Sequence, residues 1–302
     1  MAQTHWGEID IFDAHVHFFS PAFFEALAQQ KGSGGVAELL GWEEPVTAED
    51  LADRWVAELD RQNVARAMLI ASIPNDTFSV GLATAKYPGR FSAVYMANPM
   101  LPSADIRFEA ALAEDKVNGI FLFPAMHRYS LHEDKICGLL QVVAGHPGTL
   151  VYVHCGALSI GFRKKLGLPS HFDMRYSNPI DLHALACAFP RVNFVIPHFG
   201  AGYFREALML ADMCPNVYLD TSSSNGWMRY QTGTLDLEGV FRKALDVVGP
   251  RRLLFGTDSS WFPRGWISRV FEDQAAALSR LGIDAEAAQA IFGGNLRGLI
   301  AK

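Results

Sequence analysis

The sequence predicts an α/β fold of the (β/α)8 TIM-barrel class. Eight short apolar runs alternate with longer segments rich in alanine and leucine, an order typical of parallel strands joined by crossover helices. Several runs are apolar on consecutive residues, as are strands buried on both faces of a parallel sheet. The 302 residues are enough for one such barrel.

The predicted strands are short, and their apolar stretches include FLF, VYV, FVI and LLF. They lie at Ile9–Asp13, Ala67–Ile73, Phe91–Ala97, Gly119–Phe123, Leu150–His154, Val192–His198, Val217–Thr221 and Leu253–Thr257. Eight strand-and-helix units of this kind close into a barrel. The alternative, an open doubly wound sheet, requires a glycine-rich phosphate loop after the first strand, where this sequence has HVHFFSP instead.

Amphipathic helices are predicted between the strands. The first, Ala48–Gln62, follows Thr47, which can cap its N-terminus with Asp50 placed three residues further on. The others are Ser103–Asp115, His132–Ala144, Asp181–Phe189, Tyr203–Met213 and Leu237–Val248. Several are followed by proline or glycine before the next strand, which marks the end of a helix.

Two connections are longer than the usual length of about two to six residues. Phe18–Pro45 follows the first strand and contains GSGG, so we expect an inserted loop region, either a mobile lid or a small element. Gly156–Asn178 follows the fifth strand. Both lie at carboxyl ends of strands, where barrel enzymes build active sites. We expect residues 1–302 to form a single barrel domain, because no repeat or low-complexity tract divides them.

Composition and charge narrow the class of protein. Half of the residues are hydrophobic and 19% are charged, and the net charge of -6 gives no support for a nucleic-acid or acidic-membrane partner. No apolar stretch reaches the roughly 18–20 residues of a spanning helix, and the N-terminus does not resemble a signal peptide. The four separated cysteines, Cys137, Cys155, Cys187 and Cys214, are expected to be reduced thiols of a soluble cytoplasmic protein.

Histidines and an aspartate stand at the ends of four predicted strands. His15 and His17 follow the first strand in FDAHVHFF, and side chains two apart on a strand point the same way. His154, His198 and Asp258 stand at the ends of the fifth, sixth and eighth strands. Because the carboxyl ends of barrel strands share one mouth, these side chains are expected to converge. Imidazoles and carboxylates together suit zinc and neighbouring divalent metals.

This ordered set, HxH followed by two single histidines and an aspartate, resembles the amidohydrolase superfamily over essentially the whole chain. The flanking motifs resemble its amidohydrolase-related subgroup, which includes aminocarboxymuconate-semialdehyde decarboxylase. The resemblance implies that His15, His17, His154 and Asp258 bind the metal. It also implies that His198 acts as acid, base or electrostatic helper beside the metal-activated water.

One position departs from the pattern of many relatives. They carry a carboxylated lysine on the fourth strand that bridges two metals, whereas GIFLFP places Phe121 there. An apolar ring cannot bridge metals, so we expect one divalent ion, with zinc favoured by the resemblance and Mn²⁺ or Fe²⁺ also suited to the ligands. Asp13, directly before HVH, can either accept a hydrogen bond from a ligand histidine or cap the strand.

The expected activity is hydrolysis of a small organic substrate by metal-activated water, with His198 and Asp258 as catalytic residues. The alternative is a non-oxidative decarboxylase of a small aromatic or muconate-type acid that uses the same metal site. A third interpretation is a barrel that binds metal or ligand without catalysis. The sequence separates the first two poorly, because both chemistries need the same ligands.

Basic and aromatic residues in loops at the carboxyl ends of strands suggest how the substrate is held. The predicted substrate-binding residues are Arg128, Trp227, Arg229 and Trp261. Arg163 lies in the long loop after the fifth strand. Because guanidinium groups pair with carboxylates and indoles with planar rings, we expect a small, planar substrate bearing a carboxylate or carbonyl. The Phe18–Pro45 segment and the region near Trp227 could also form a homodimer interface.

Overall fold

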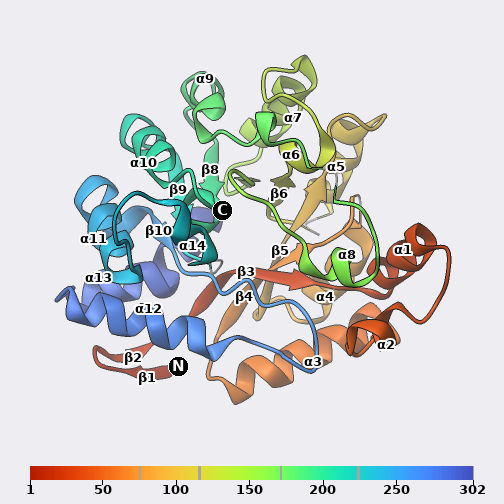
Figure 1. Ribbon diagram of the computed structural model, residues 1–302, viewed down its shortest axis with the longest axis horizontal. Helices are drawn as coiled ribbons and strands as arrows, with labels where there is room; N and C mark the ends of the chain where they lie inside the picture. Colours follow the sequence, from red (N-terminus) through yellow and green to blue (C-terminus); the bar gives the residue numbers. More distant parts are fainter. Residues whose placement is uncertain (75, 115–116, 171, 223–224, 302) are drawn as a thin grey trace.

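The computed structural model describes residues 1–301 except 75, 115–116, 171 and 223–224. Its centre is an eight-stranded parallel sheet in which each strand pairs with the next along the chain. The strands are β3 (Phe12–Phe18), β4 (Arg66–Ala71), β5 (Phe91–Ala97), β6 (Gly119–Leu122), β7 (Leu150–Val153), β8 (Asn193–Ile196), β9 (Val217–Asp220) and β10 (Leu253–Leu254). Figure 1 shows these strands ringed by helices, which confirms the predicted (β/α)8 barrel.

The sheet closes on itself between the first and last barrel strands. The amide of Ala14 donates a hydrogen bond to the carbonyl of Phe255 at 2.7 Å, and the amide of His17 donates to the carbonyl of Ser259 at 2.7 Å. In the opposite direction, the amide of Asp258 donates to the carbonyl of His15 at 2.9 Å. These bonds continue past the short β10, so the segment after it completes the barrel wall beside β3.

Both faces of the barrel strands are buried, as the consecutive apolar residues predict. In β4, Met68 and Ile70 pack with Phe121 and Tyr152 inside the barrel. Leu69, between them, packs instead in the layer shared with the surrounding helices. Period-two alternation thus divides each strand between the barrel interior and the helix layer.

The first barrel strand lies later than predicted. The expected strand was Ile9–Asp13, but Ile9 belongs to a small antiparallel hairpin formed by β1 (Ala2–Thr4) and β2 (Gly7–Ile9). His15 and His17 therefore lie within the barrel strand β3, whereas the predicted strand ended before them. Its pairing with β4 shifts register between Asp13 and Val16, a local irregularity of the kind that re-aims side chains.

Helices follow most strands and cover the outside of the barrel (Figure 1). They are α1 (Pro21–Lys31), α2 (Val36–Leu40), α3 (Ala48–Arg61), α4 (Thr77–Lys86), α5 (Ala104–Ala113), α6 (Pro124–His127), α7 (Asp134–Ala144), α8 (Gly161–Lys165), α9 (His183–Ala188), α10 (Phe204–Met213), α11 (Leu237–Val248), α12 (Ser268–Arg280), α13 (Ala285–Gln289) and α14 (Asn295–Ile300). Short helical turns are η1 (Met174–Tyr176), η2 (Pro179–Leu182), η3 (Pro197–Gly200), η4 (Asn225–Tyr230), η5 (Pro250–Arg252) and the π-helical η6 (Ala290–Gly294).

The predicted helices are found with small changes at their ends, and the last residue of the predicted Ser103–Asp115 lies outside the described residues. The hydroxyl of Thr47 accepts a hydrogen bond from the amide of Asp50 at 3.0 Å, so the predicted cap of α3 is confirmed. Outside the inserted region, the helices α4, α6, α8, α12 and α13 were not in the predicted set. Within the described part of the chain, no helix combines the length and apolar character needed to cross a lipid bilayer.

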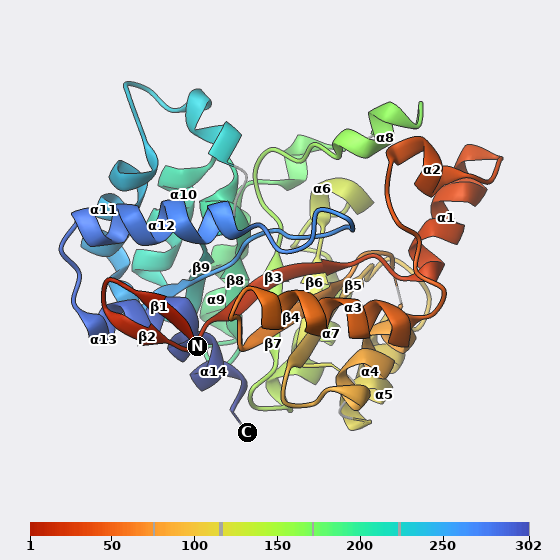
Figure 2. The same cartoon turned by 90° about the horizontal axis from the view of Figure 1, so that it is seen from below.

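The inserted region after β3 is a small helical element made of α1 and α2. Its aromatic rings form a cluster with residues of distant segments: Phe19 stacks on Phe23 with centroids 4.0 Å apart, and Trp42 stacks on Trp261 at 4.8 Å. Phe162 of α8 joins the cluster edge-on, 5.7 Å from Phe23. In both views, α1, α2 and α8 lie together on one side of the barrel mouth (Figures 1 and 2).

Candidate metal centre

The predicted polar side chains meet in one pocket at the carboxyl ends of the strands. His15 and His17 come from β3, His154 directly follows β7, His198 lies just after β8, and Asp258 follows β10. All five line a pocket of about 330 Å³. Residues separated by more than 200 positions are therefore brought together by the closure of the barrel.

The tightest group consists of His15, His17 and Asp258. Their ligand atoms all lie within 4.8 Å of one another. Nε2 of His15 is 3.7 Å from Oδ1 of Asp258, and Nε2 of His17 is 3.3 Å from the same oxygen. Two imidazole nitrogens and a carboxylate oxygen facing one point form a donor set suited to a divalent transition metal.

Hydrogen bonds at the other ring nitrogens leave both Nε2 atoms available. Nδ1 of His15 donates to Oδ2 of the fully buried Asp220 at 2.6 Å. Nδ1 of His17 lies 2.9 Å from the hydroxyl of Ser72, which itself donates to the carbonyl of Ile70 at 3.0 Å. The hydroxyl proton is thus used, so Nδ1 of His17 is the donor. In the neutral form of each ring the proton is therefore on Nδ1 and the lone pair is on Nε2, as metal ligands require.

Asp220 contacts the candidate ligand His15 and was missed by the sequence reasoning. It ends β9 in VYLDTS, the same kind of apolar run followed by a carboxylate that identified Asp258. Its other oxygen, Oδ1, accepts a hydrogen bond from the amide of Ser222 at 2.6 Å, which fixes the carboxylate toward His15. The signal was present in the sequence, but only the fold shows which ring this aspartate faces.

Asp13 was expected either to accept a hydrogen bond from a ligand histidine or to cap the strand. In the structure it contacts the backbone of His15 and not its ring. Its carboxylate accepts hydrogen bonds from the backbone amide of His15 at 2.8 Å, the hydroxyl of Thr257 at 2.5 Å and the indole of Trp266 at 2.7 Å. Burial raises the pKa of Asp13 to about 6. Asp13 therefore joins β3 to the segment after β10. The ring of His15 is oriented instead by its hydrogen bond to Asp220.

His154 lies beside the tight group and is not one of its three members. Its ring stacks on Phe123, with centroids 5.5 Å apart, and lies 5.5 Å from the ring of His198. Its Nδ1 is buried without a hydrogen-bond partner among the described residues. A buried imidazole with an unsatisfied nitrogen beside two histidines and an aspartate is consistent with a ligand position.

His198 is held in an unusual backbone conformation. Its φ is +56° and that of Phe199 is +51°, in the left-handed region, and Asp258 has a φ of +62°. Such conformations cost about 1–3 kcal/mol each and persist where the surrounding structure imposes them, often at functional sites. Nδ1 of His198 donates to the carbonyl of Ser222 at 3.2 Å. This bond leaves Nε2 of His198 as the ring's free nitrogen.

Two side chains of the pocket, Asp258 and His15, have pKa values shifted toward their charged forms. Burial acts to raise the pKa of Asp258, but a hydrogen bond to His17 and the charges of His198 and His15 hold it well below its usual value. Burial also acts to lower the pKa of His15, yet the charge of Asp220 and the hydrogen bond to it outweigh burial and raise that pKa. Asp258 is therefore an anion at neutral pH.

The other three imidazoles are neutral at neutral pH. Burial lowers the pKa of His17, although Asp258 opposes the effect. Burial also lowers the pKa of His154 well below its usual value, and the neighbouring His198 and His15 add to this. The pKa of His198 is lowered by burial and by the charge of His15. Neutral imidazoles are the form that binds cations and accepts protons.

Phe121 occupies the place where a bridging lysine was considered. It lies on β6, with its ring 5.7 Å from that of His15 in an edge-on arrangement, and it stacks on Phe123 at 4.2 Å. An apolar ring beside the candidate ligands offers no donor for a second metal. That the site holds one metal ion stays a prediction.

Of the predicted substrate-binding residues, some line the pocket in the structure and others lie outside it. Trp261 lines the pocket, where it stacks on Trp42 and carries the guanidinium of Arg264 3.4 Å above its ring. Arg163 also lines the pocket, and its guanidinium donates to the side-chain oxygen of Gln30 at 2.9 Å. A basic group therefore does reach the pocket, from the long loop after β7.

Arg128, Trp227 and Arg229 do not belong to the pocket lining. Trp227 is buried against Phe204 of α10, with ring centroids 5.6 Å apart. Arg229 is exposed and lies over the ring of Tyr230 at 4.9 Å, and Arg128 is exposed after α6. Position in a loop at the correct end of a strand did not determine the direction of these side chains.

Comparisons with known proteins give a family and a set of similar folds. A family model described as amidohydrolase matches residues 12–297. Protein fluG of Emericella nidulans is 37% identical over 110 residues, which are 36% of this chain and only 12% of that protein. The chain therefore matches only a small part of that relative.

Solved structures share the fold at low sequence identity. The 5-carboxyvanillate decarboxylase LigW from Sphingomonas paucimobilis superposes with a TM-score of 0.66 at 13% identity, covering 97% of this chain and 99% of that one. The manganese-bound 5-carboxyvanillate decarboxylase LigW2 from Novosphingobium aromaticivorans gives 0.63 at 15%, covering 99% of both. A probable 2-pyrone-4,6-dicarboxylic acid hydrolase from Acinetobacter baumannii, with citric acid bound, gives 0.62 at 15%, covering 97% and 99%.

Proposed function

Because this chain belongs to the amidohydrolase family, we propose that it is a metal-dependent hydrolase of a small organic molecule that bears a carboxylate or carbonyl group. One observation carries the proposal. The Nε2 atoms of His15 and His17 converge on the carboxylate of Asp258, while their Nδ1 atoms are held by Asp220 and Ser72. A cation site needs imidazoles whose tautomer is fixed and whose free nitrogens point to the same position.

The residues that would hold a single divalent cation are His15, His17, His154 and Asp258. Nitrogen and carboxylate donors suit Zn²⁺, Mn²⁺ and Fe²⁺, and the similarly folded LigW2 has manganese bound. A bound cation would supply Lewis-acid polarisation of substrate oxygens and activation of a water molecule. Zinc remains our first expectation for the metal.

His198 would move the proton. Its Nδ1 is held by Ser222, and its ring lies 4.9 Å from the ring of His15, centroid to centroid. Its lowered pKa keeps Nε2 free to accept a proton at neutral pH and return it to the leaving group. Asp258, ionised beside it, would accept a hydrogen bond from the attacking water and keep that water oriented.

The pocket favours a small substrate with one charged end. A volume of about 330 Å³ is at the lower end of the range for small-molecule sites. Aromatic side chains form its outer wall, among them Phe19, Phe162 and Trp261. Arg163 is the lining guanidinium that a substrate carboxylate would meet. An apolar wall with one cationic group fits a planar carboxylated molecule.

Decarboxylation is the second candidate, because two similar folds are those of 5-carboxyvanillate decarboxylases. The same residues would serve that reaction if His198 first took up a proton from solvent and then delivered it to the carbon that loses CO₂, in place of attack by water. A barrel that only binds metal or ligand is the third candidate, and it predicts no turnover of any substrate. A cytoplasmic location, a homodimer and a single domain over the chain remain predictions.

The test is an activity screen on metal-loaded protein. The panel would contain small lactones and amides together with aromatic and muconate-type carboxylic acids, with products identified by mass spectrometry and CO₂ measured separately. Products whose summed mass equals that of the substrate plus one water, and which disappear in His198→Asn, support hydrolysis. Release of CO₂ without such a product assigns the decarboxylase instead. Turnover that is unchanged in His198→Asn contradicts both mechanisms.

A further inference from the structure

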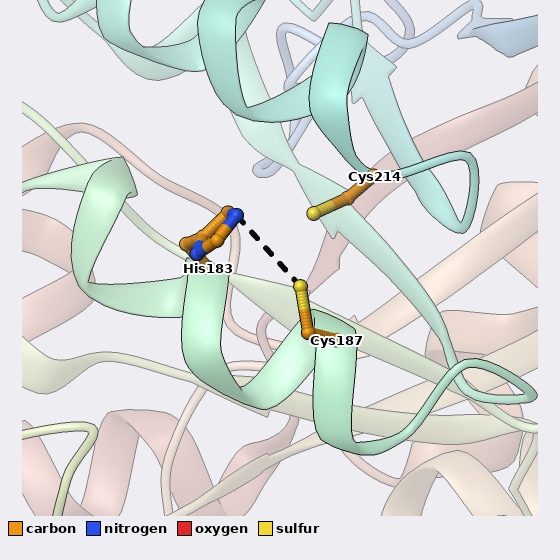
Figure 3. A group of neighbouring side chains, drawn as sticks. All are labelled: His183, Cys187 and Cys214. Carbon is orange, nitrogen blue, oxygen red and sulfur yellow. Dashed lines mark hydrogen bonds between the residues drawn. The ribbon is translucent and has the colours of Figure 1, made fainter.

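Three potential metal ligands lie together outside the pocket. His183 and Cys187 are on α9, and Cys214 directly follows α10 (Figure 3). Figure 3 shows the imidazole and both sulfur atoms facing a common space between the two helices. Cys214 precedes β9, so the cluster lies toward the amino ends of the strands, opposite the pocket described above.

The distances in this cluster are close to those of a tetrahedral metal site. Nε2 of His183 is 3.7 Å from Sγ of Cys187, and the three ligand atoms all lie within 4.8 Å of one another. Zinc bonds of about 2.3 Å to sulfur and 2.0–2.1 Å to nitrogen, at tetrahedral angles, separate S from N by about 3.6 Å and S from S by about 3.8 Å. The His183–Cys187 pair already has this spacing. The sulfur of Cys214 needs to move by at most about 1 Å to reach it.

The backbone holds these ligands in position. His183 and Cys187 are four residues apart on one helix and therefore share a face. The side chain of Asn216 donates hydrogen bonds to the carbonyls of Ala186, Phe189 and Val192 at 3.1, 3.1 and 2.9 Å. Since Asn216 is two residues after Cys214, these bonds tie the end of α9 to the segment that carries the third ligand. A chance approach of mobile side chains would have no such framework.

The three side chains differ in solvent exposure, which determines how a cation would reach them. Cys187 is exposed, His183 is partly exposed and Cys214 is buried. An ion can therefore enter from solvent and meet the buried thiol last. Among the described residues, no further histidine, cysteine or carboxylate belongs to the group, so water would complete the coordination.

We propose that His183, Cys187 and Cys214 form a second metal site, selective for a thiophilic cation, with Zn²⁺ as the expected ion. Two sulfur donors and one imidazole suit Zn²⁺ and Cd²⁺ and discriminate against Mg²⁺, Ca²⁺ and Mn²⁺. Each thiol gives its proton to solvent as the ion binds, so two thiolates neutralise the charge of the dication. The ion joins α9 to α10 and stabilises the outer layer of the barrel, independently of catalysis.

Cadmium separates this site from the catalytic one. Thiolate-to-cadmium charge transfer gives an ultraviolet absorption band, and the candidate catalytic ligands contain no sulfur. The experiment titrates Cd²⁺ into reduced protein and compares wild type with Cys187→Ser, Cys214→Ser and the control Cys137→Ser. Cys137 is a partly buried thiol on α7, outside the cluster. We expect the band in wild type and in Cys137→Ser, with band-forming affinity at least about 100-fold lower in the two cluster variants.

A second measurement keeps the proposal testable if Cys214→Ser does not fold. Zn²⁺ should slow alkylation of Cys187 at least about tenfold, because a metal-bound thiolate is shielded, and should leave Cys137 unchanged. Peptide mass spectrometry gives the rate at each cysteine. Absence of the band in wild type overturns the proposal. An equal band in folded Cys187→Ser, or equal alkylation of Cys187 with and without Zn²⁺, also overturns it.

Discussion

Replacement of Asp220 by asparagine tests how the candidate catalytic site is held. Asp220 is fully buried, and its Oδ2 accepts the 2.6 Å hydrogen bond from Nδ1 of His15, while Oδ1 accepts from the amide of Ser222. Asp220→Asn keeps the shape of the side chain but removes its charge. If the amide oxygen stays on Ser222, the amide group facing Nδ1 of His15 becomes a donor. The ring then loses the contact that fixes its tautomer.

Two effects of this change oppose each other. Without the carboxylate the pKa of His15 falls, so fewer protons compete with the cation for Nε2. The same loss makes the ring a weaker and less well-oriented ligand. Changes of this kind at partners of metal-bound histidines typically cost 10–100-fold in metal affinity, so orientation and basicity outweigh proton competition. We therefore expect Asp220→Asn to lose about 1.4–2.7 kcal/mol of metal-binding free energy.

The assay is competition with a chromophoric chelator for Mn²⁺ at neutral pH. Manganese is chosen because the proposed cysteine site should not bind it. The matched control is Asp284→Asn, which makes the same charge change at the exposed N-cap of α13, where asparagine still accepts from the amide of Ala287. If Asp220→Asn binds Mn²⁺ within twofold of wild type and melts at the same temperature, the role given to Asp220 is refuted.

Three further predictions follow from the pocket. His198→Asn should lower kcat on any substrate found by about 10²–10⁴-fold and leave the Mn²⁺ content unchanged, because His198 moves a proton and is not a ligand; metal loss in this variant would contradict that assignment. Removal of Mn²⁺ present at 100 times its Kd should cost about 2.7 kcal/mol and lower the melting temperature by roughly 5–10 °C, as scanning calorimetry would show; an unchanged transition would mean that no cation is bound to the fold. Arg163→Ala and Trp261→Ala should each raise KM at least about tenfold, the lower range of an interaction lost with a charged or aromatic group, whereas Arg229→Ala should match wild type; steady-state kinetics that placed the effect on Arg229 would reverse our view of the pocket.

The sequence predicted the barrel well because parallel strands leave a strong pattern. Runs such as FLF in β6 and VYV in β7 are apolar on both faces, and few other folds bury eight such strands in one chain. The boundary of β3 was misplaced because Ile9 is also a good strand residue and pairs in the β1–β2 hairpin. Local preference alone does not decide which partner a strand residue chooses.

The candidate ligands were predictable for a geometric reason, whereas of the four predicted substrate contacts Trp261 alone lines the pocket. His15, His17, His154, His198 and Asp258 stand on or next to barrel strands, whose carboxyl ends must converge. The side chains of Arg128, Trp227 and Arg229 are on loops and turns, where the direction depends on tertiary packing.

The cluster of His183, Cys187 and Cys214 leaves no sequence signal of the usual kind. Cys187 and Cys214 are far apart in the chain and form no CxxC motif. Only the packing of α9 beside the end of α10 brings the second sulfur to the first. A spacing-based search therefore passes over this cluster, although i and i+4 on α9 would have paired His183 with Cys187.

Metal analysis of three proteins tests the central claim most directly. Wild type, His15→Ala and Asp258→Ala would be loaded with Mn²⁺, passed through a desalting column and measured for manganese per chain, with circular dichroism to show that each is folded. The convergence of these side chains on one point predicts about one Mn²⁺ per chain in wild type and less than about a tenth of that in both variants. Full occupancy in both folded variants, or none in wild type, would contradict it.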